Sequence, residues 1–157
     1  MATSARRRER RQRPHRDAYP PIRHFADAVC TAFAIHSQFD RARACFVLGA
    51  RGRVEQGWAL TGPEHNEGHV LRLALCMPDR EVAGRSVLLI TARGDEDITD
   101  LAEHDVATWR RLQADVESRG AHLVDWILVG GEVGAPDESI RSMRFATDES
   151  AVDTWAV

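Results

Sequence analysis

Two histidines four residues apart, His65 and His69, have the spacing that best suits metal chemistry. If both lie on one helix, this separation places them on the same face, as in other helical histidine pairs that bind zinc. No third ligand is nearby in the sequence, and the pair straddles a predicted helix start. The alternative, which we favour, is that Glu64 and Glu67 flank the histidines at a helix N-terminus, where carboxylates suit the helix dipole.

The segment from residue 95 to residue 105 concentrates acidic side chains after a predicted strand. Its groups with oxygen or nitrogen ligand atoms are Asp95, Glu96, Asp97, Asp100, Glu103, His104 and Asp105. Such a cluster could hold a hard cation such as Mg²⁺ or Ca²⁺. The order of the acids is not that of an EF-hand loop, so we favour a solvated acidic loop. A further hypothesis is a hydrolase with a relocated zinc site, in which His65 and His69 are joined by His104 or Asp105.

The first sixteen residues carry seven Arg and one Glu and almost no apolar side chains. They cannot bury enough surface to offset ordering, so residues 1–19 are predicted to be a disordered arm. Such an arm could bind nucleic-acid phosphates by counterion release, without sequence preference. A solvated tail is the alternative, and the acidic remainder of the chain counts against a broad nucleic-acid-binding face. The candidate contact residues are Arg6, Arg7, Arg8, Arg10, Arg11 and Arg13.

The composition of the chain indicates one domain with short tails. It has 157 residues, of which 43% are hydrophobic, which is enough for a core. No apolar run approaches the roughly 20 residues of a membrane span, and the arm lacks the apolar segment of a secretory signal. We therefore expect a cytoplasmic protein without membrane contact. Three cysteines in apolar stretches, Cys30, Cys45 and Cys76, are expected to be buried free thiols.

The element order centres on a strand, a helix and a second strand. Residues 87–90 form the first apolar run, residues 101–118 repeat apolar side chains at helical spacing up to Arg119-Gly120, and residues 122–129 form the second strand. Such a unit is normally a right-handed crossover with its helix on one face of the sheet.

The remaining elements complete an α/β domain with a mixed central sheet. Upstream of the central unit we expect a helix over 22–35, a hairpin of strands 44–48 and 54–60, and a helix over 67–77 with Asn66 as its cap. Downstream, residues 139–145 alternate as a last strand. Residues 147–157 form an acidic C-terminal tail.

Several phrases in this order resemble the RadC-like branch of the JAB/MPN (JAMM) family. They are ACFVLGARGRVEQGWAL, PDREVAGRSVLLIT, HDVATWRRLQADVESRGAHLVDWILVGG and ESIRSM. The resemblance extends over about residues 22–145. It implies a JAB/MPN-like (cytidine-deaminase-like) fold, with a mixed central sheet flanked by helices, over residues 20–146.

Catalytic members of that family hold zinc with a His-x-His pair and an Asp, assisted by a Ser and a Glu. In this chain the matching positions are Ala92, Gly94, Asp105, Ala102 and a position near Ala44. Only the Asp remains, so the resemblance implies that the family's zinc catalysis cannot operate. For Asp105 we expect an ordinary role as a cap of backbone N–H groups at a helix start.

The resemblance and the missing ligands together predict a non-catalytic RadC-like binding or scaffold protein, with no catalytic residues and no cofactor. The expected partner is a protein or a nucleic acid, and a homodimer is an open alternative. It would bind at the groove floored by residues 92–105 or at a sheet edge. Two alternatives stay open. One is the zinc-dependent hydrolase at His65 and His69, and the other is a DNA-associated protein that binds through its N-terminal arm.

Overall fold

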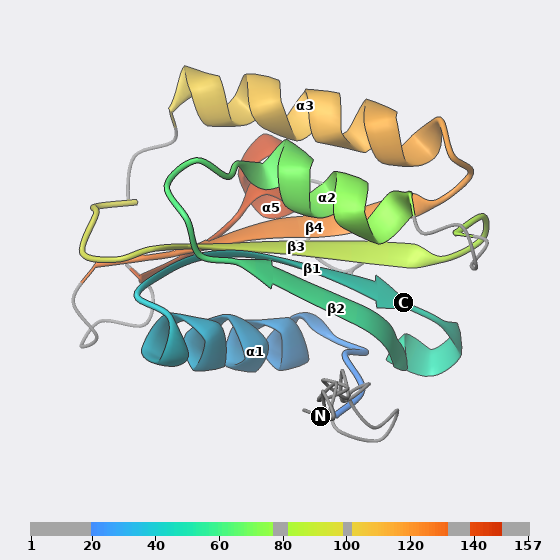
Figure 1. Ribbon diagram of the computed structural model, residues 1–157, viewed down its shortest axis with the longest axis horizontal. Coiled ribbons are helices and arrows are strands. Elements are labelled where there is room, and N and C mark those ends of the chain that lie inside the picture. Colours follow the sequence, from blue (N-terminus) through green and yellow to red (C-terminus); the bar gives the residue numbers. More distant parts are fainter. Residues whose placement is uncertain (1–19, 77–81, 99–101, 132–138, 149–157) are drawn as a thin grey trace, which may run out of the picture.

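A computed structural model describes residues 20–76, 82–98, 102–131 and 139–148 (Figure 1). Within them the chain forms helices on both faces of a single sheet. In chain order the elements are α1 Phe25–Gln38, β1 Arg41–Leu48, a 3₁₀ turn η1 Ala50–Gly52, β2 Val54–Leu60, α2 Glu67–Leu75, β3 Ser86–Arg93, α3 Glu103–Glu117, β4 His122–Val129, β5 Ile140–Ser142 and α5 Met143–Thr147.

The five strands lie in the order β2-β1-β3-β4-β5. The β1–β2, β1–β3 and β4–β5 pairs are antiparallel, whereas β3 and β4 are parallel and are joined through α3. The predicted α/β class with a mixed sheet flanked by helices is therefore confirmed. Strands β1 to β4 and helices α1 to α3 coincide with predicted elements to within about four residues at their ends.

The sheet separates two hydrophobic clusters. Helix α1 covers one face, and α2 and α3 lie together over the other (Figure 1). Along β3, Val87 and Leu89 point to the α2–α3 side, and Leu88 and Ile90 point to the α1 side. Burial on both faces explains why β3 and β4 are nearly continuous apolar runs rather than alternating ones.

Local sequence accounts for the start of α2 and the end of α3. The Asn66 side chain accepts a hydrogen bond from the backbone N–H of His69 (3.1 Å), which confirms the predicted cap of α2. After α3, Gly120 adopts a φ of +73°, a left-handed conformation that favours glycine, so the chain turns back toward β4 there.

The predicted last strand over residues 139–145 is only partly right. Residues 140–142 pair with β4, and the chain then forms α5 from Met143. The Ser142 hydroxyl accepts from the backbone N–H of Phe145 (3.1 Å), so it caps the helix. Ser is a strong N-cap residue, and this local bond ends the strand pattern.

The expectation of three buried thiols is wrong for two of them. Cys45 on β1 is fully buried, but Cys30 and Cys76 are exposed. Cys30 lies midway between the buried residues Ala28 and Ala32, and on a helix the residue two positions from a buried one points away from the core. Cys76 lies at the C-cap of α2.

No helix in the described part of the chain is long and apolar enough to cross a membrane.

Candidate functional site

A hydrogen-bonded ion pair joins the end of β3 to the first turn of α3. There the Arg93 guanidinium donates two hydrogen bonds to the Asp105 carboxylate, from Nη1 to Oδ2 (3.0 Å) and from Nη2 to Oδ1 (2.7 Å). Asp105 is only 4% exposed. A two-pronged arginine–carboxylate contact is both strong and geometrically specific, so each side chain fixes the orientation of the other.

The electrostatic surroundings hold Arg93 firmly as a cation. The hydrogen bonds to Asp105 raise the pKa of Arg93, and the negative charges of Asp105, Glu67 and Glu96 add to this effect against the cost of burial. The expected helix-capping role of Asp105 is wrong. The N-cap of α3 is Ala102, which makes no side-chain cap bond, and the Asp105 carboxylate is directed to Arg93 instead.

A second hydrogen-bonded group ties the first residue of α2 to the sheet. The Glu67 Oε1 atom accepts from the Thr91 hydroxyl (3.0 Å) and from Arg43 Nε (3.2 Å). The buried Thr91 Oγ1 in turn accepts from the indole N–H of Trp126 (2.9 Å). These bonds connect α2 with β1, β3 and β4, and they use the donor and acceptor capacity of the threonine hydroxyl.

Together these residues tie two helices to the sheet. We call Arg43, Glu67, Thr91, Arg93, Asp105 and Trp126 the polar clamp. Each of its two carboxylates is paired with a guanidinium. Both oxygens of Asp105 accept from Arg93, and Oε1 of Glu67 accepts from Arg43 and Thr91. The clamp anchors the starts of α2 and α3 to the sheet.

The positions that the resemblance aligns with the family's two zinc-binding His and with its assisting Ser and Glu lie in β1, at the end of β3 and at the start of α3. Ala92 is buried with the cluster under α1, on the face of the sheet away from α3. Gly94 has a φ of +61°, where any residue with a side chain is strained. Ala102 is the N-cap of α3, and Ala44 is buried in β1. None of these four side chains has a ligating atom.

The predicted histidine pair does lie close together at the start of α2. The rings of His65 and His69 are edge-to-face, with centroids 5.8 Å apart. His69 Nδ1 accepts a hydrogen bond from the Asn66 backbone N–H (3.1 Å), and His65 Nε2 lies 3.3 Å from the Glu64 carboxylate. One nitrogen of each ring therefore faces a protein group.

A third ligand for this pair is not found within the described residues. His104 is exposed at the start of α3, and Asp105 beside it is paired with Arg93. The described parts of the chain contain no cluster of three or more His, Cys, Asp or Glu side chains with metal-binding geometry. The structure thus brings His65 and His69 together but does not bring His104 or Asp105 to them.

The acidic segment is anchored by weak surface pairs where it is described. Arg41 lies 3.6 Å from both Asp95 and Glu96, with the Asp95 side chain 93% exposed. Asp97 is exposed as well. Asp100 lies outside the described residues, as do the six arginines of the N-terminal arm. Exposed pairs of this kind contribute at most about 1 kcal/mol to stability, so they fit a solvated loop.

One buried carboxylate, Asp125 in β4, was missed by sequence analysis. It is completely buried, and it accepts hydrogen bonds from the Ser142 hydroxyl (2.5 Å), the Arg144 backbone N–H (3.1 Å) and its neighbour Trp126 N–H (2.7 Å). The signal that could have found it is a single acid inside the apolar run LVDWILV. Buried charges need such partners. Asp125 thereby fixes the start of α5.

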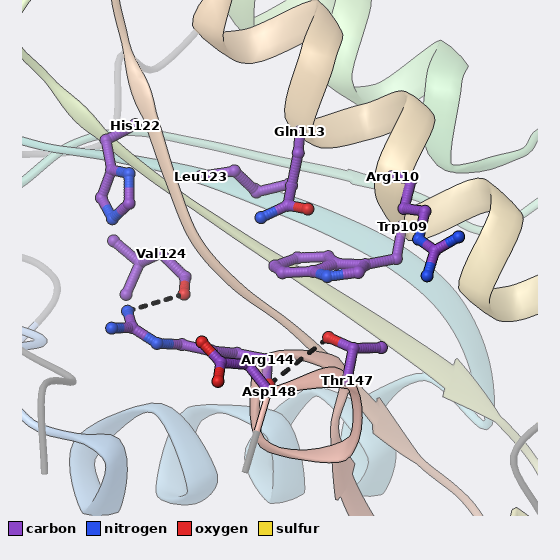
Figure 2. A pocket seen from close by; sticks show the side chains of 9 residues that line it. All are labelled: Trp109, Arg110, Gln113, His122, Leu123, Val124, Arg144, Thr147 and Asp148. Atoms are coloured by element: carbon purple, nitrogen blue, oxygen red, sulfur yellow. Dashed lines mark hydrogen bonds between the residues drawn. The ribbon is translucent and has the colours of Figure 1, made fainter. Parts of the chain in front are cut away.

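Two cavities of about 470 Å³ flank α3. The first lies between α3, β4 and α5, and Figure 2 shows Trp109, Gln113, His122 and Arg144 around it. Arg144 is turned toward the Val124 carbonyl oxygen, to which its Nη1 donates (3.4 Å), so part of its donor capacity is used within the fold. The second cavity is a groove between α2 and α3.

No protein-family model, curated protein or solved structure matches this chain. Its functional interpretation therefore rests on its own residues and their geometry.

Proposed function

We propose that the chain is a non-catalytic RadC-like JAB/MPN domain that acts in the cytoplasm as a binding or scaffold protein. The observation that carries this proposal is the pair of hydrogen bonds between Arg93 and Asp105. Asp105 is the only one of the five family positions that keeps its functional side chain, and here a guanidinium neutralises it. In catalytic members of the family the matching Asp binds zinc, whereas here Asp105 faces a guanidinium group of the same chain.

The chemistry of zinc supports the same proposal. A catalytic zinc site needs about three protein ligands and an open position for water. Ala92 and Gly94 supply none, and Asp105 is engaged by Arg93. The left-handed backbone at Gly94 also disfavours a histidine there. The mixed sheet, with a hairpin before the β3–α3–β4 crossover, is compatible with the family's expected arrangement.

Metal content and thermal stability test the proposal. Purified protein is analysed for zinc, and its melting temperature is compared before and after treatment with a chelator. We expect far less than one zinc per chain and an unchanged melting temperature, because the described residues contain no ligand set for the ion. One zinc per chain, together with a lower melting temperature after chelation, would overturn the proposal.

The zinc hydrolase with a relocated site is the second candidate, and the close approach of His65 and His69 is the observation that favours it. It predicts that His69→Ala removes bound zinc. The matched control is His122→Ala, because His122 is also exposed but lies at the start of β4 and far along the chain from the pair. Equal metal content in both variants and in the wild type would exclude this candidate.

Binding of DNA through the N-terminal arm is a separate hypothesis that rests on sequence alone. It predicts that replacing Arg6, Arg7, Arg8, Arg10, Arg11 and Arg13 by Gln abolishes salt-sensitive DNA binding, because phosphate contacts release counterions. Undiminished binding by that variant would show that the arm is not responsible.

A further inference from the structure

The groove between α2 and α3 is lined mainly by groups that donate hydrogen bonds. Its volume is about 470 Å³, and the two helices run along its sides over the same face of the sheet (Figure 1). Arg72 extends from α2, Arg111 from α3 and Arg119 from the turn after α3. Asp115 is the one carboxylate that lines it. Three guanidinium groups thus face a single negative charge.

These three arginines are available to a ligand. Each is exposed, and none has a carboxylate partner within 4.0 Å among the described residues. They differ in this respect from Arg43, Arg85 and Arg93, which are paired with acids elsewhere in the fold. Unpaired arginines that share one concave surface attract anions, because the guanidinium fork matches phosphate or carboxylate oxygens.

The start of α2 adds further donors at one end of the groove. His69 Nδ1 accepts the Asn66 backbone N–H, so in the neutral ring the proton lies on Nε2, which can donate. The backbone N–H of Gly68, in the first turn of α2, has no partner within the helix. Free N–H groups at a helix start favour a negative charge. The donors therefore extend along the groove.

Their spread indicates a ligand with more than one anionic group. Arg111 lies six residues before the end of α3 at Glu117, which is about 9 Å along the helix axis at 1.5 Å per residue, and Arg119 lies in the turn beyond that end. None of the residues that line the groove is Phe, Tyr or Trp. Protein partners are usually held by aromatic anchors in pockets, so this lining suits a chain of charges better than a peptide.

We propose that the α2–α3 groove binds a run of phosphate groups, contacted by Arg72, Arg111 and Arg119. Two sources share this chemistry, a nucleic-acid strand and a free polyphosphate. Without aromatic side chains to stack bases, a strand would be held by its backbone and without sequence preference. The proposal does not depend on whether the protein binds zinc. Binding to the groove and metal content therefore test the two proposals independently.

The test is fluorescence anisotropy with a labelled single-stranded 12-nucleotide oligothymidylate and the full chain, over a range of salt concentrations. Arg111→Gln combined with Arg119→Gln should weaken binding about tenfold or more at low salt. It should also reduce the salt dependence by about 0.7 in log–log slope for each lost phosphate contact. Arg110→Gln is the matched control, because Arg110 is exposed on the same helix but lines the other cavity.

Competition identifies the source of the phosphates. Displacement of the oligonucleotide by tripolyphosphate at equal phosphate concentration supports a free polyphosphate, and failure to displace it supports a nucleic-acid backbone. The proposal is overturned if the wild-type chain does not bind the oligonucleotide at low salt, or if the double variant binds as well as Arg110→Gln. It is also overturned if polyglutamate competes as well as the phosphate ligands, because the groove would then be a general anion site.

Discussion

Arg93 and Asp105 meet through two hydrogen bonds across the space between the end of β3 and the first turn of α3. They are twelve residues apart in the chain, and the pair fixes where α3 begins above the sheet. An aspartate in the first turn of a helix is ordinarily explained by the helix dipole. Here its partner is a side chain from a neighbouring strand, so its role is tertiary.

Removing one member of this pair should destabilise the fold more than removing both. Arg93→Ala leaves the Asp105 carboxylate buried without its partner, and we expect a loss of about 2–3 kcal/mol in the free energy of unfolding. This is below the usual range for fully buried pairs because the Arg93 side chain is 24% exposed. The double variant should show a coupling energy of about 1–2 kcal/mol. Urea denaturation of the wild type, Arg93→Ala, Asp105→Ala and the double variant measures this double-mutant cycle.

The control for this cycle is Arg41→Ala. Arg41 lies near Asp95 and Glu96, but its side chain is 55% exposed. A change of less than about 1 kcal/mol is expected there because solvent screens the pairs. Equal losses in the free energy of unfolding for Arg93→Ala and Arg41→Ala would show that the contact with Asp105 contributes no more stability than an exposed ion pair.

Asp125 should hold α5 against β4. Asp125→Ala removes the acceptor of three hydrogen bonds and leaves buried donors unpaired, so we expect a loss of about 2–4 kcal/mol in the free energy of unfolding. Ser142→Ala removes the cap of α5 and should cost only about 1 kcal/mol. Amide hydrogen exchange should rise in residues 143–147 in both variants. Unchanged exchange in Asp125→Ala would contradict this role.

The start of α1 should lose stability in acid. The backbone N–H groups of Arg23 and His24 donate to Asp27 (2.9 and 3.0 Å), and these bonds hold the pKa of Asp27 below its usual value of 3.8. A carboxylate with a lower pKa in the folded state than in the unfolded state stabilises the fold at pH values above its unfolded-state pKa. This stabilisation is lost as the pH falls through its folded-state pKa. Asp27→Ala should therefore cost about 1 kcal/mol at pH 7.

The loss caused by Asp27→Ala should shrink as the pH falls below 3.8 and through the lower pKa of the folded state, because the wild type then also loses the charge. Thermal or urea unfolding of both proteins across this range measures the effect. Asp115→Ala is the matched control, because Asp115 is an exposed helical aspartate without an ion-pair partner in the described structure. If the free energies of unfolding of the wild type and Asp27→Ala differ by the same amount at all pH values, the charge of Asp27 does not stabilise the start of α1.

Two of the three thiols should react in the folded protein. Burial raises the pKa of Cys45, so it stays protonated and inaccessible, whereas Cys30 and Cys76 are exposed. A thiol reagent at neutral pH should label two cysteines per native chain and the third only after denaturation. Cys45→Ser should leave the native count unchanged. Rapid labelling of three cysteines in native protein would contradict the buried position of β1.

The main elements could be predicted because their signals are local. Residues 122–129 were expected as a strand and form β4, and the helix between the parallel strands follows from apolar residues at helical spacing. Predictions were wrong where a local pattern has two readings. Residues 139–145 alternate like a strand, yet the hydroxyl of Ser142 caps a helix from Met143. Cys30 seemed buried because its neighbours are apolar, although periodicity places it on the outer face of α1.

The candidate sites depend on contacts that the sequence does not encode locally. The approach of His65 to His69 could be predicted from a spacing of four residues. The pairing of Asp105 with Arg93 could not, because it depends on how α3 lies over the end of β3. The same is true of Arg72 and Arg111, which come from different helices and share a groove only once both helices pack on the sheet.

The sequence by itself determined the α/β class, the order of the main elements and the lack of ligating side chains at positions 92 and 94, since periodicity and residue identity are properties of the chain. Only the tertiary structure decided that Asp105 is paired with Arg93, that Asp125 fixes α5 and that unpaired arginines line one groove. The physical reason is that hydrogen bonds and charge interactions act over a few ångströms. Which side chains come that close is set by the packing of whole helices on the sheet.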